Sequence, residues 1–134
     1  MAAETPPIYL TVGEVVALHG AILASAGQPS TPLRDGALLE SALQRPQHAA
    51  FYEGADIITQ AALYMTGIAL NHPFVDGNKR AGYVAGITFL HLNGYEEAAA
   101  RLNDAAPGQW LEQVVTHALP LAEFIERLRA RLER

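Results

Sequence analysis

Apolar residues recur at helical spacing along most of this chain. Thr11 and Glu14 form a capping-box pattern, and the apolar positions that follow predict a first helix ending near Gly27. Asp35 is placed to cap a second helix, which we expect Pro46 to stop because proline cannot continue the helical hydrogen bonds.

The stretch after this proline is aromatic but has no helical period. Residues 47–55, QHAAFYEGA, therefore predict an exposed loop or a short hairpin. Asp56 is placed to cap a third helix, whose apolar positions repeat until about Asn71. The helix must end there because Pro73 disfavours helical geometry at the residue before it.

A fourth helix is predicted from about Asn78 to Asn93, where an Asn-Gly pair is a strong stop. Residues 81–90 contain no charge and are apolar on all sides, which is typical of a buried central helix. Gly82 costs about 1 kcal/mol relative to alanine in a helix, so we expect it to mark close packing.

The last third of the chain predicts two more helices. Residues 95–104, YEEAAARLND, are ambiguous, and we expect an irregular connection. Pro107 opens a predicted fifth helix and Pro120 a sixth. Because no repeat, low-complexity tract or composition break divides the sequence, we predict a single all-α domain over residues 1–134, a compact bundle of about six helices.

Composition narrows the possible functions. Half of the 134 residues are apolar, and no apolar run is long enough for a membrane span or placed as in a signal peptide. The net charge of −5 argues against non-specific binding to nucleic acid or to anionic lipid, so we expect no direct DNA binding and no membrane partner. The absence of cysteine excludes disulfides and fits a reducing cytoplasm, where we expect the protein to act.

The loop before the fourth predicted helix, NHPFVDGNKR at 71–80, carries the candidate chemistry. Lys79 and Arg80 stand at a helix N-terminus, where cations are mildly unfavourable unless an anion is bound. Gly77 permits backbone angles closed to other residues, and Asn78 is a favoured helix cap. Together they would leave N–H groups of the first turn facing a ligand, which is a phosphate-binding arrangement.

Two further residues of this loop suit phosphate chemistry. Asp76 offers a hard oxygen ligand for Mg²⁺ on a phosphate, and His72 can take a proton from an attacking hydroxyl. Phe74 is expected to point into the core and anchor the loop. Each residue alone has an ordinary structural explanation, as a turn, a cap or a solvated surface. Their combination favours a site for phosphate or for a Mg²⁺–nucleotide.

The same loop resembles the signature of the Fic/Doc superfamily, H-x-F-x-[D/E]-[G/A]-N-[G/K]-R, and meets every fixed position from His72 to Arg80. Similarity to the death-on-curing (Doc) branch extends over LRDGALLESALQRP at 33–46 and FLHLNGY at 89–95. The resemblance implies a compact helical bundle with the active-site loop between two central helices. Doc proteins are the toxin half of toxin–antitoxin pairs.

The resemblance also implies a role for each loop residue. His72 would be the general base and Asp76 the Mg²⁺ ligand. Gly77 and Asn78 would form the anion nest, with the Asn78 side chain also reaching phosphate. Arg80 would clamp a phosphate through its planar guanidinium, so His72, Asp76, Lys79 and Arg80 are the candidate catalytic residues.

Lys79 separates the two branches of the superfamily. Most Fic enzymes have glycine at this position and transfer AMP, whereas the lysine of Doc proteins accompanies transfer of the γ-phosphate of ATP. The implied target is a threonine of translation elongation factor Tu, which would arrest translation. Because we find no self-inhibiting helix pattern, we expect a separate antitoxin, Phd-like or another small protein, to silence the chain.

Several hypotheses stay open beside this one. By family analogy, Phe51, Tyr52 and Glu53 would belong to a flap that docks the target protein by strand addition. Arg34, Asp35 and Arg45 are better explained by capping and surface ion pairs. A nucleotidyltransferase is the enzymatic alternative, and a catalytically idle antitoxin-binding module is the non-enzymatic one.

Overall fold

The computed structural model describes residues 6–133, and within this range the chain is all-α, with no β-strand. Seven α-helices and one 3-10 turn are present in the described range, so the predicted fold class is confirmed. The elements are α1 Val12–Ser25, α2 Gly36–Glu53, α3 Ile57–Asn71, α4 Asn78–Leu92, α5 Glu96–Ala99, η1 Ala100–Leu102, α6 Ala105–Val115 and α7 Leu121–Leu132.

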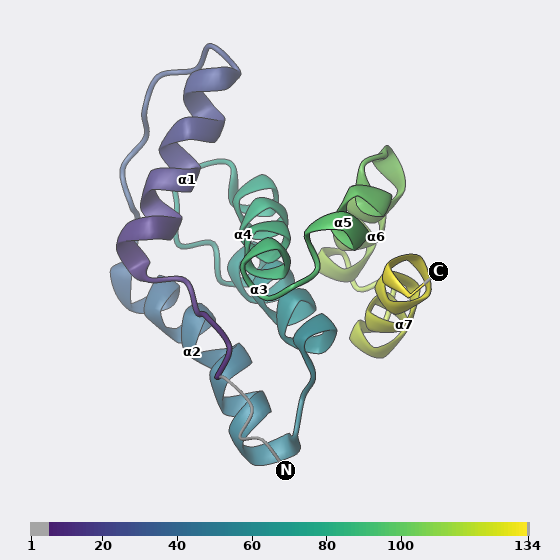
Figure 1. Cartoon of the computed structure of the whole chain (residues 1–134). Coiled ribbons are helices and arrows are strands. Elements are labelled where there is room, and N and C mark those ends of the chain that lie inside the picture. Colours follow the sequence, from purple (N-terminus) through teal and green to yellow (C-terminus); the bar gives the residue numbers. More distant parts are fainter. Residues whose placement is uncertain (1–5, 134) are drawn as a thin grey trace.

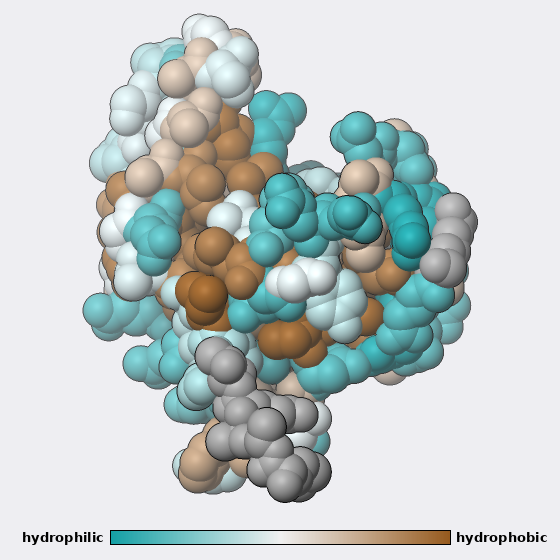
Figure 2. Space-filling view, in the orientation of Figure 1, coloured by the Kyte–Doolittle hydropathy of each residue, from teal (hydrophilic) through white to brown (hydrophobic). Residues whose placement is uncertain are grey.

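The helices α3 and α4 form the centre of the molecule, with α1 and α2 on one side and α5 to α7 on the other (Figure 1). Every residue from Gln60 to Ala69 is buried, so α3 is the most enclosed helix. The helix α4 is central as expected, but it is partly exposed at Tyr83, Val84, Ile87 and Thr88. Hydrophobic residues gather where α1 lies over the central helices, whereas α5 to α7 present a hydrophilic outer surface (Figure 2).

Close approach of α3 and α4 depends on two glycines. A Cβ atom at Gly82 would lie 2.5 Å from the backbone oxygen of Met65. A Cβ atom at Gly86 would lie 2.5 Å from Cγ of Met65 and 2.9 Å from the backbone oxygen of Ala61. The close packing expected at Gly82 is therefore confirmed, and it fixes the separation of the two helices that flank the loop.

Side-chain caps set most of the helix starts. The capping box of Thr11 and Glu14 is present, and Asp35 and Asp56 cap α2 and α3 as predicted. The start predicted at Pro107 is two residues late, because Asp104 accepts from the backbone N–H of Ala106 and begins α6 earlier.

The helix α2 does not stop at Pro46, and this prediction is wrong. Residues 47–53 are helical rather than a loop or hairpin, and the helix ends at Gly54, which has a left-handed backbone with φ 67°. The buried residues of α2 follow one uninterrupted helical spacing on both sides of the proline, at Leu39, Ala42, Leu43, Pro46 and Ala49. Burial of this continuous stripe outweighs the single hydrogen bond that proline removes.

The segment expected to be an irregular connection is also partly helical. It contains α5 and η1, in which Ala99 and Leu102 are buried against the core. Among residues 6–133 no helix combines the length and apolar character that a membrane span requires. The expectation of no signal peptide falls largely on residues 1–5, which lie outside the described residues.

Candidate active site

The candidate loop connects the C-terminus of α3 to the N-terminus of α4. A left-handed residue stands at each end of it, His72 with φ 51° and Gly77 with φ 77°. The special backbone conformation predicted for Gly77 is confirmed. His72 is not a glycine, so its left-handed backbone conformation costs about 1–2 kcal/mol. The surrounding contacts must therefore hold it in place.

Phe74 and Asn78 hold the loop from within. The Phe74 ring is buried, as expected, and its backbone N–H donates to Oδ1 of Asn78 at 2.9 Å. The Asn78 amide donates in return to the Phe74 carbonyl oxygen at 2.9 Å. The same amide nitrogen lies 3.5 Å from Nδ1 of His72, a weak contact that does not fix which ring nitrogen carries the proton.

Asn78 is therefore not the cap of α4, and this prediction is wrong. Gly77 occupies the N-cap position, and Asn78 is the first helical residue. Its side-chain amide bonds to the backbone of Phe74 and makes no cap hydrogen bond in α4. The two hydrogen bonds with Phe74 make Asn78 a brace of the loop, and its predicted contact with phosphate stays a prediction.

Two side chains from outside the motif hold the loop, and neither was predicted from the sequence to lie at the site. Arg34 donates from Nε to the carbonyl oxygen of His72 at 2.8 Å. His19, on α1, donates from Nε2 to the carbonyl oxygen of Asp76 at 2.7 Å and is buried. The one signal for His19 was its place on the apolar stripe of the first helix, which predicts burial but no partner.

The N-terminus of α4 is open to an anion. The helices α1, α2, α3 and α6 each have a side-chain cap, whereas α4 has none. Within residues 6–133 the backbone N–H groups of Asn78, Lys79 and Arg80 have no acceptor. This arrangement fits the predicted anion nest, since free N–H groups and the helix dipole both favour negative charge.

The two cations at this end differ in their contacts. Nζ of Lys79 forms an ion pair with the carboxylate of Glu112 on α6, and both side chains are about half exposed. Arg80 is exposed, and its guanidinium has no partner among the residues that the structure describes. The Arg80 guanidinium is thus open to an anion, whereas the Lys79 ammonium is paired with Glu112.

The structure brings the predicted catalytic and phosphate-binding residues into one pocket of about 610 Å³. This volume lies in the range of small-molecule sites. The pocket is lined by His72, Asp76, Gly77, Asn78, Lys79 and Arg80, together with Ile22, Leu23, Val75 and Gln28.

The predicted flap does not lie at this pocket. Phe51, Tyr52 and Glu53 form the last turn of α2, and Tyr52 and Glu53 line a separate pocket of about 760 Å³ between α2, α3 and α7. The expected loop is wrong because α2 continues past Pro46. Residues 33–35 lie beside the active-site loop instead, where Leu33 forms an isolated antiparallel bridge with Phe74.

Among the described residues, Asp76 is the one carboxylate that lines the pocket. Its Oδ1 accepts from the backbone N–H of Gly77 at 2.8 Å, and the side chain is exposed. No cluster of three His, Cys, Asp or Glu suited to a metal occurs in the described part of the chain. A single carboxylate beside a phosphate nest fits Mg²⁺ that arrives with a nucleotide, because Mg²⁺ takes most of its other ligands from phosphate and water.

Comparisons with known proteins match the part of the chain that contains this loop. The sequence model of the Fic/DOC family matches residues 9–90, which include α1 to α3, the loop and most of α4. The chain is also 42% identical over 71 residues to a protein described as Toxin Doc from Mycolicibacterium smegmatis. That match covers 50% of this chain and 53% of the relative, so the chain spans about half the length of the relative it matches.

Proposed function

The chain belongs to the Fic/DOC family, and from this premise we propose that it is a Doc-type toxin kinase that transfers the γ-phosphate of ATP to a protein hydroxyl. The observation that carries the proposal is the uncapped N-terminus of α4 beside His72, Asp76 and two cations in one pocket. The match to a protein described as Toxin Doc supports the toxin assignment.

In the proposed reaction the triphosphate lies at the N-terminus of α4. His72 takes the proton from the target hydroxyl while its oxygen attacks the γ-phosphorus. The bond from this phosphorus to the bridging oxygen breaks, and ADP leaves with the electron pair. Arg80 and the N–H groups of the first turn stabilise the charge on the phosphates.

Asp76 would hold Mg²⁺, which supplies positive charge against the phosphate oxygens when it is bound. Lys79 would contribute a second cation after leaving Glu112. An exposed ion pair is worth about 0–1 kcal/mol, whereas a charge-assisted hydrogen bond contributes about 1.5–3 kcal/mol. Because the exposed pair with Glu112 is weak, it does not prevent Lys79 from moving to a phosphate.

The proposed target is a threonine of elongation factor Tu, and the proposed consequence is arrested translation in the cytoplasm. A small antitoxin, Phd-like or of another type, would silence the enzyme by binding to it. Both partners come from the family analogy, and a gene for a small protein directly upstream would support the second.

Labelled ATP tests the proposal directly. The purified chain is incubated with a bacterial lysate, or with purified elongation factor Tu, and with ATP labelled at the α or the γ phosphate. We expect protein label from the γ position alone, abolished in His72→Ala protein that remains folded. Label from the α position would instead identify a nucleotidyltransferase, and no label with either ATP would favour an idle binding module.

A further inference from the structure

A short segment before α2 lies alongside the active-site loop. Leu33 bridges Phe74 in the antiparallel sense. The backbone N–H groups of Arg34 and Asp35 both donate to the carbonyl oxygen of Pro73, at 2.7 and 3.0 Å. These contacts place the Arg34 side chain at the start of the loop, 38 residues away in sequence from His72.

The Arg34 guanidinium binds the carbonyl groups that end α3. Nε and Nη2 both donate to the carbonyl oxygen of His72, and Nη2 also lies 3.4 Å from the carbonyl oxygen of Asn71. A helix C-terminus carries a partial negative charge, so a cation is favourable there. Arg34 thus serves as an added C-terminal cap of α3.

These contacts contradict the expected surface ion pair. Within the described residues Arg34 has no acidic partner, and all of its hydrogen bonds are with the loop or the end of α3. Its neighbour Asp35 uses the carboxylate to cap α2, as predicted, by accepting from the N–H groups of Ala37 and Leu38.

We infer that Arg34 is a positioning residue that holds His72 in the orientation needed for proton transfer. His72 is the strained residue of the loop, with φ 51° and an exposed imidazole. Its backbone N–H donates to the carbonyl oxygen of Ile68 at 3.3 Å, and its carbonyl oxygen accepts from Arg34. The guanidinium therefore fixes the peptide group that follows the His72 side chain.

The kinetic consequence rests on the proposed function. Nucleotide is expected to bind at the N-terminus of α4, which Arg34 does not contact. Loss of Arg34 should therefore lower kcat by about 10- to 100-fold, since small misplacement of a catalytic group has effects of this size. The KM for ATP should change by less than about twofold, because ground-state binding is retained.

Two variants separate charge from geometry. Arg34→Gln keeps one planar N–H donor without the charge, and Arg34→Lys keeps the charge without the guanidinium fork. Arg45→Gln is the matched control, because Arg45 is an exposed arginine on α2 with no hydrogen bond or ion pair from its guanidinium in the described range. Nucleotide affinity and thermal unfolding are measured for all three variants alongside kcat.

An NMR measurement on the full chain tests the positioning without relying on activity. Amide exchange at His72 and Phe74 and the ring signals of His72 report on the loop. In Arg34→Gln we expect about tenfold faster exchange at these two amides and shifted ring signals, with Ala81 in α4 unchanged. Arg45→Gln should match the wild type in every readout.

Wild-type loop signals together with wild-type kcat in Arg34→Gln would overturn the inference. A parallel loss of kcat, nucleotide affinity and thermal stability would also overturn it, because that pattern indicates a general structural role. If the loop signals respond but the wild type transfers no phosphate, Arg34 still positions His72 and the proposed function fails.

Discussion

The imidazole of His19 lies flat against the ring of Phe74, with 3.8 Å between the ring centroids and 7° between the ring planes. From this position Nε2 donates to the carbonyl oxygen of Asp76 at 2.7 Å. A buried side chain of α1 therefore supports the Asp76 end of the loop, and Arg34 supports the His72 end.

Replacing His19 should loosen Asp76 while leaving His72 in place. In His19→Phe the stacking partner of Phe74 is kept, but the partly buried carbonyl of Asp76 loses its donor, which costs about 0.5–1.5 kcal/mol. We expect lower stability in urea unfolding and, if Asp76 holds Mg²⁺ as proposed, a higher Mg²⁺ concentration for half-maximal activity.

His19→Gln is the matched variant, because it can keep a donor for the carbonyl while losing the stacking. It should be less stable than the wild type but closer to it in Mg²⁺ requirement. Equal Mg²⁺ requirements in His19→Phe, His19→Gln and the wild type would contradict a role for this hydrogen bond.

The two central helices should not tolerate a methyl group at Gly82. The added Cβ would lie 2.5 Å from the backbone oxygen of Met65. A side chain could relieve such a clash by changing rotamer, but the helix backbone cannot. We expect Gly82→Ala to lower the free energy of unfolding by about 1–3 kcal/mol, measured by urea denaturation.

Gly20 provides the opposite test in α1. A Cβ atom there would meet nothing within 4 Å. Gly20→Ala should therefore raise the free energy of unfolding by about 0.5–1 kcal/mol, because alanine is the better helix former. If both substitutions changed stability in the same direction, the close approach of α3 and α4 would not explain the effect at Gly82.

Local chemistry made a large part of the fold predictable. Thr11, Asp35 and Asp56 were identified correctly as caps because a cap bonds to groups two or three residues away. The loop from His72 to Arg80 could be predicted as a candidate site for a similar reason, since its candidate groups are contiguous in sequence.

Local preference failed where packing or distant partners decided the outcome. Pro46 is a helix breaker, yet the apolar stripe of α2 continues through it against α3. Asn78 is a favoured cap, yet it bonds to Phe74. The contacts of Arg34 and His19 with the loop join residues 38 and 57 positions apart, and nothing in a short window of sequence reports such pairs.

The ion pair of Lys79 with Glu112 should compete with nucleotide. Glu112→Gln removes the competing charge and frees Lys79 for phosphate. Because an exposed pair is worth about 1 kcal/mol at most, nucleotide affinity should rise by no more than about fivefold. Fluorescence titration at low and high salt checks this, and the gain should shrink at high salt, where the pair is already screened. A loss of affinity would show that Glu112 helps to bind the nucleotide.

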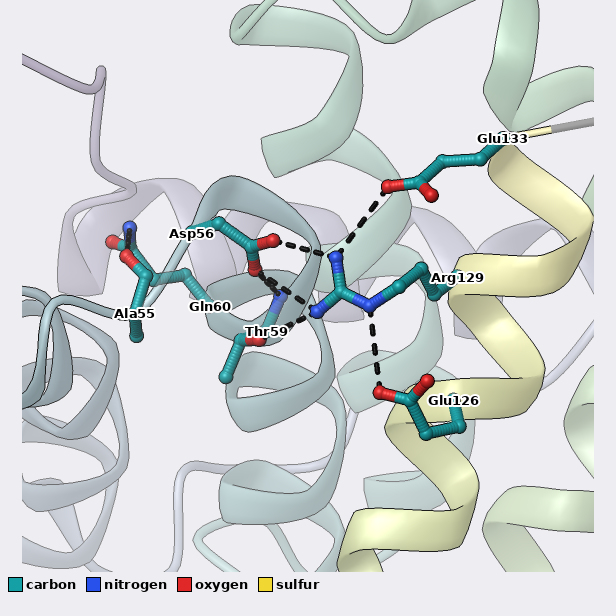
Figure 3. A network of polar contacts seen from close by, with 7 residues as sticks. All are labelled: Ala55, Asp56, Thr59, Gln60, Glu126, Arg129 and Glu133. Atoms are coloured by element: carbon teal, nitrogen blue, oxygen red, sulfur yellow. Dashed lines mark hydrogen bonds and ion pairs between the residues drawn. The ribbon is translucent and has the colours of Figure 1, made fainter.

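The ion pair between α7 and the start of α3 should make stability depend on acid pH. Nη1 of Arg129 donates to the Asp56 carboxylate at 2.6 Å, and Thr59, Glu126 and Glu133 complete the network (Figure 3). The hydrogen bond from Arg129 lowers the pKa of Asp56 to about 2. Because this folded-state pKa lies below the ordinary value of 3.8, the pair stabilises the fold above that value and the contribution is lost as pH falls towards 2.

Asp56→Asn isolates this charge, because asparagine keeps the oxygen that caps α3. Since the carboxylate is half exposed, we expect the pair to contribute no more than about 1 kcal/mol at neutral pH. Urea unfolding of Asp56→Asn, Arg129→Gln and the double variant gives the coupling free energy between the two side chains. This coupling should be present at pH 7 and decline between about pH 5 and pH 2. A coupling that stays constant over that range would mean that packing of the Arg129 side chain, and not its charge, joins α7 to α3.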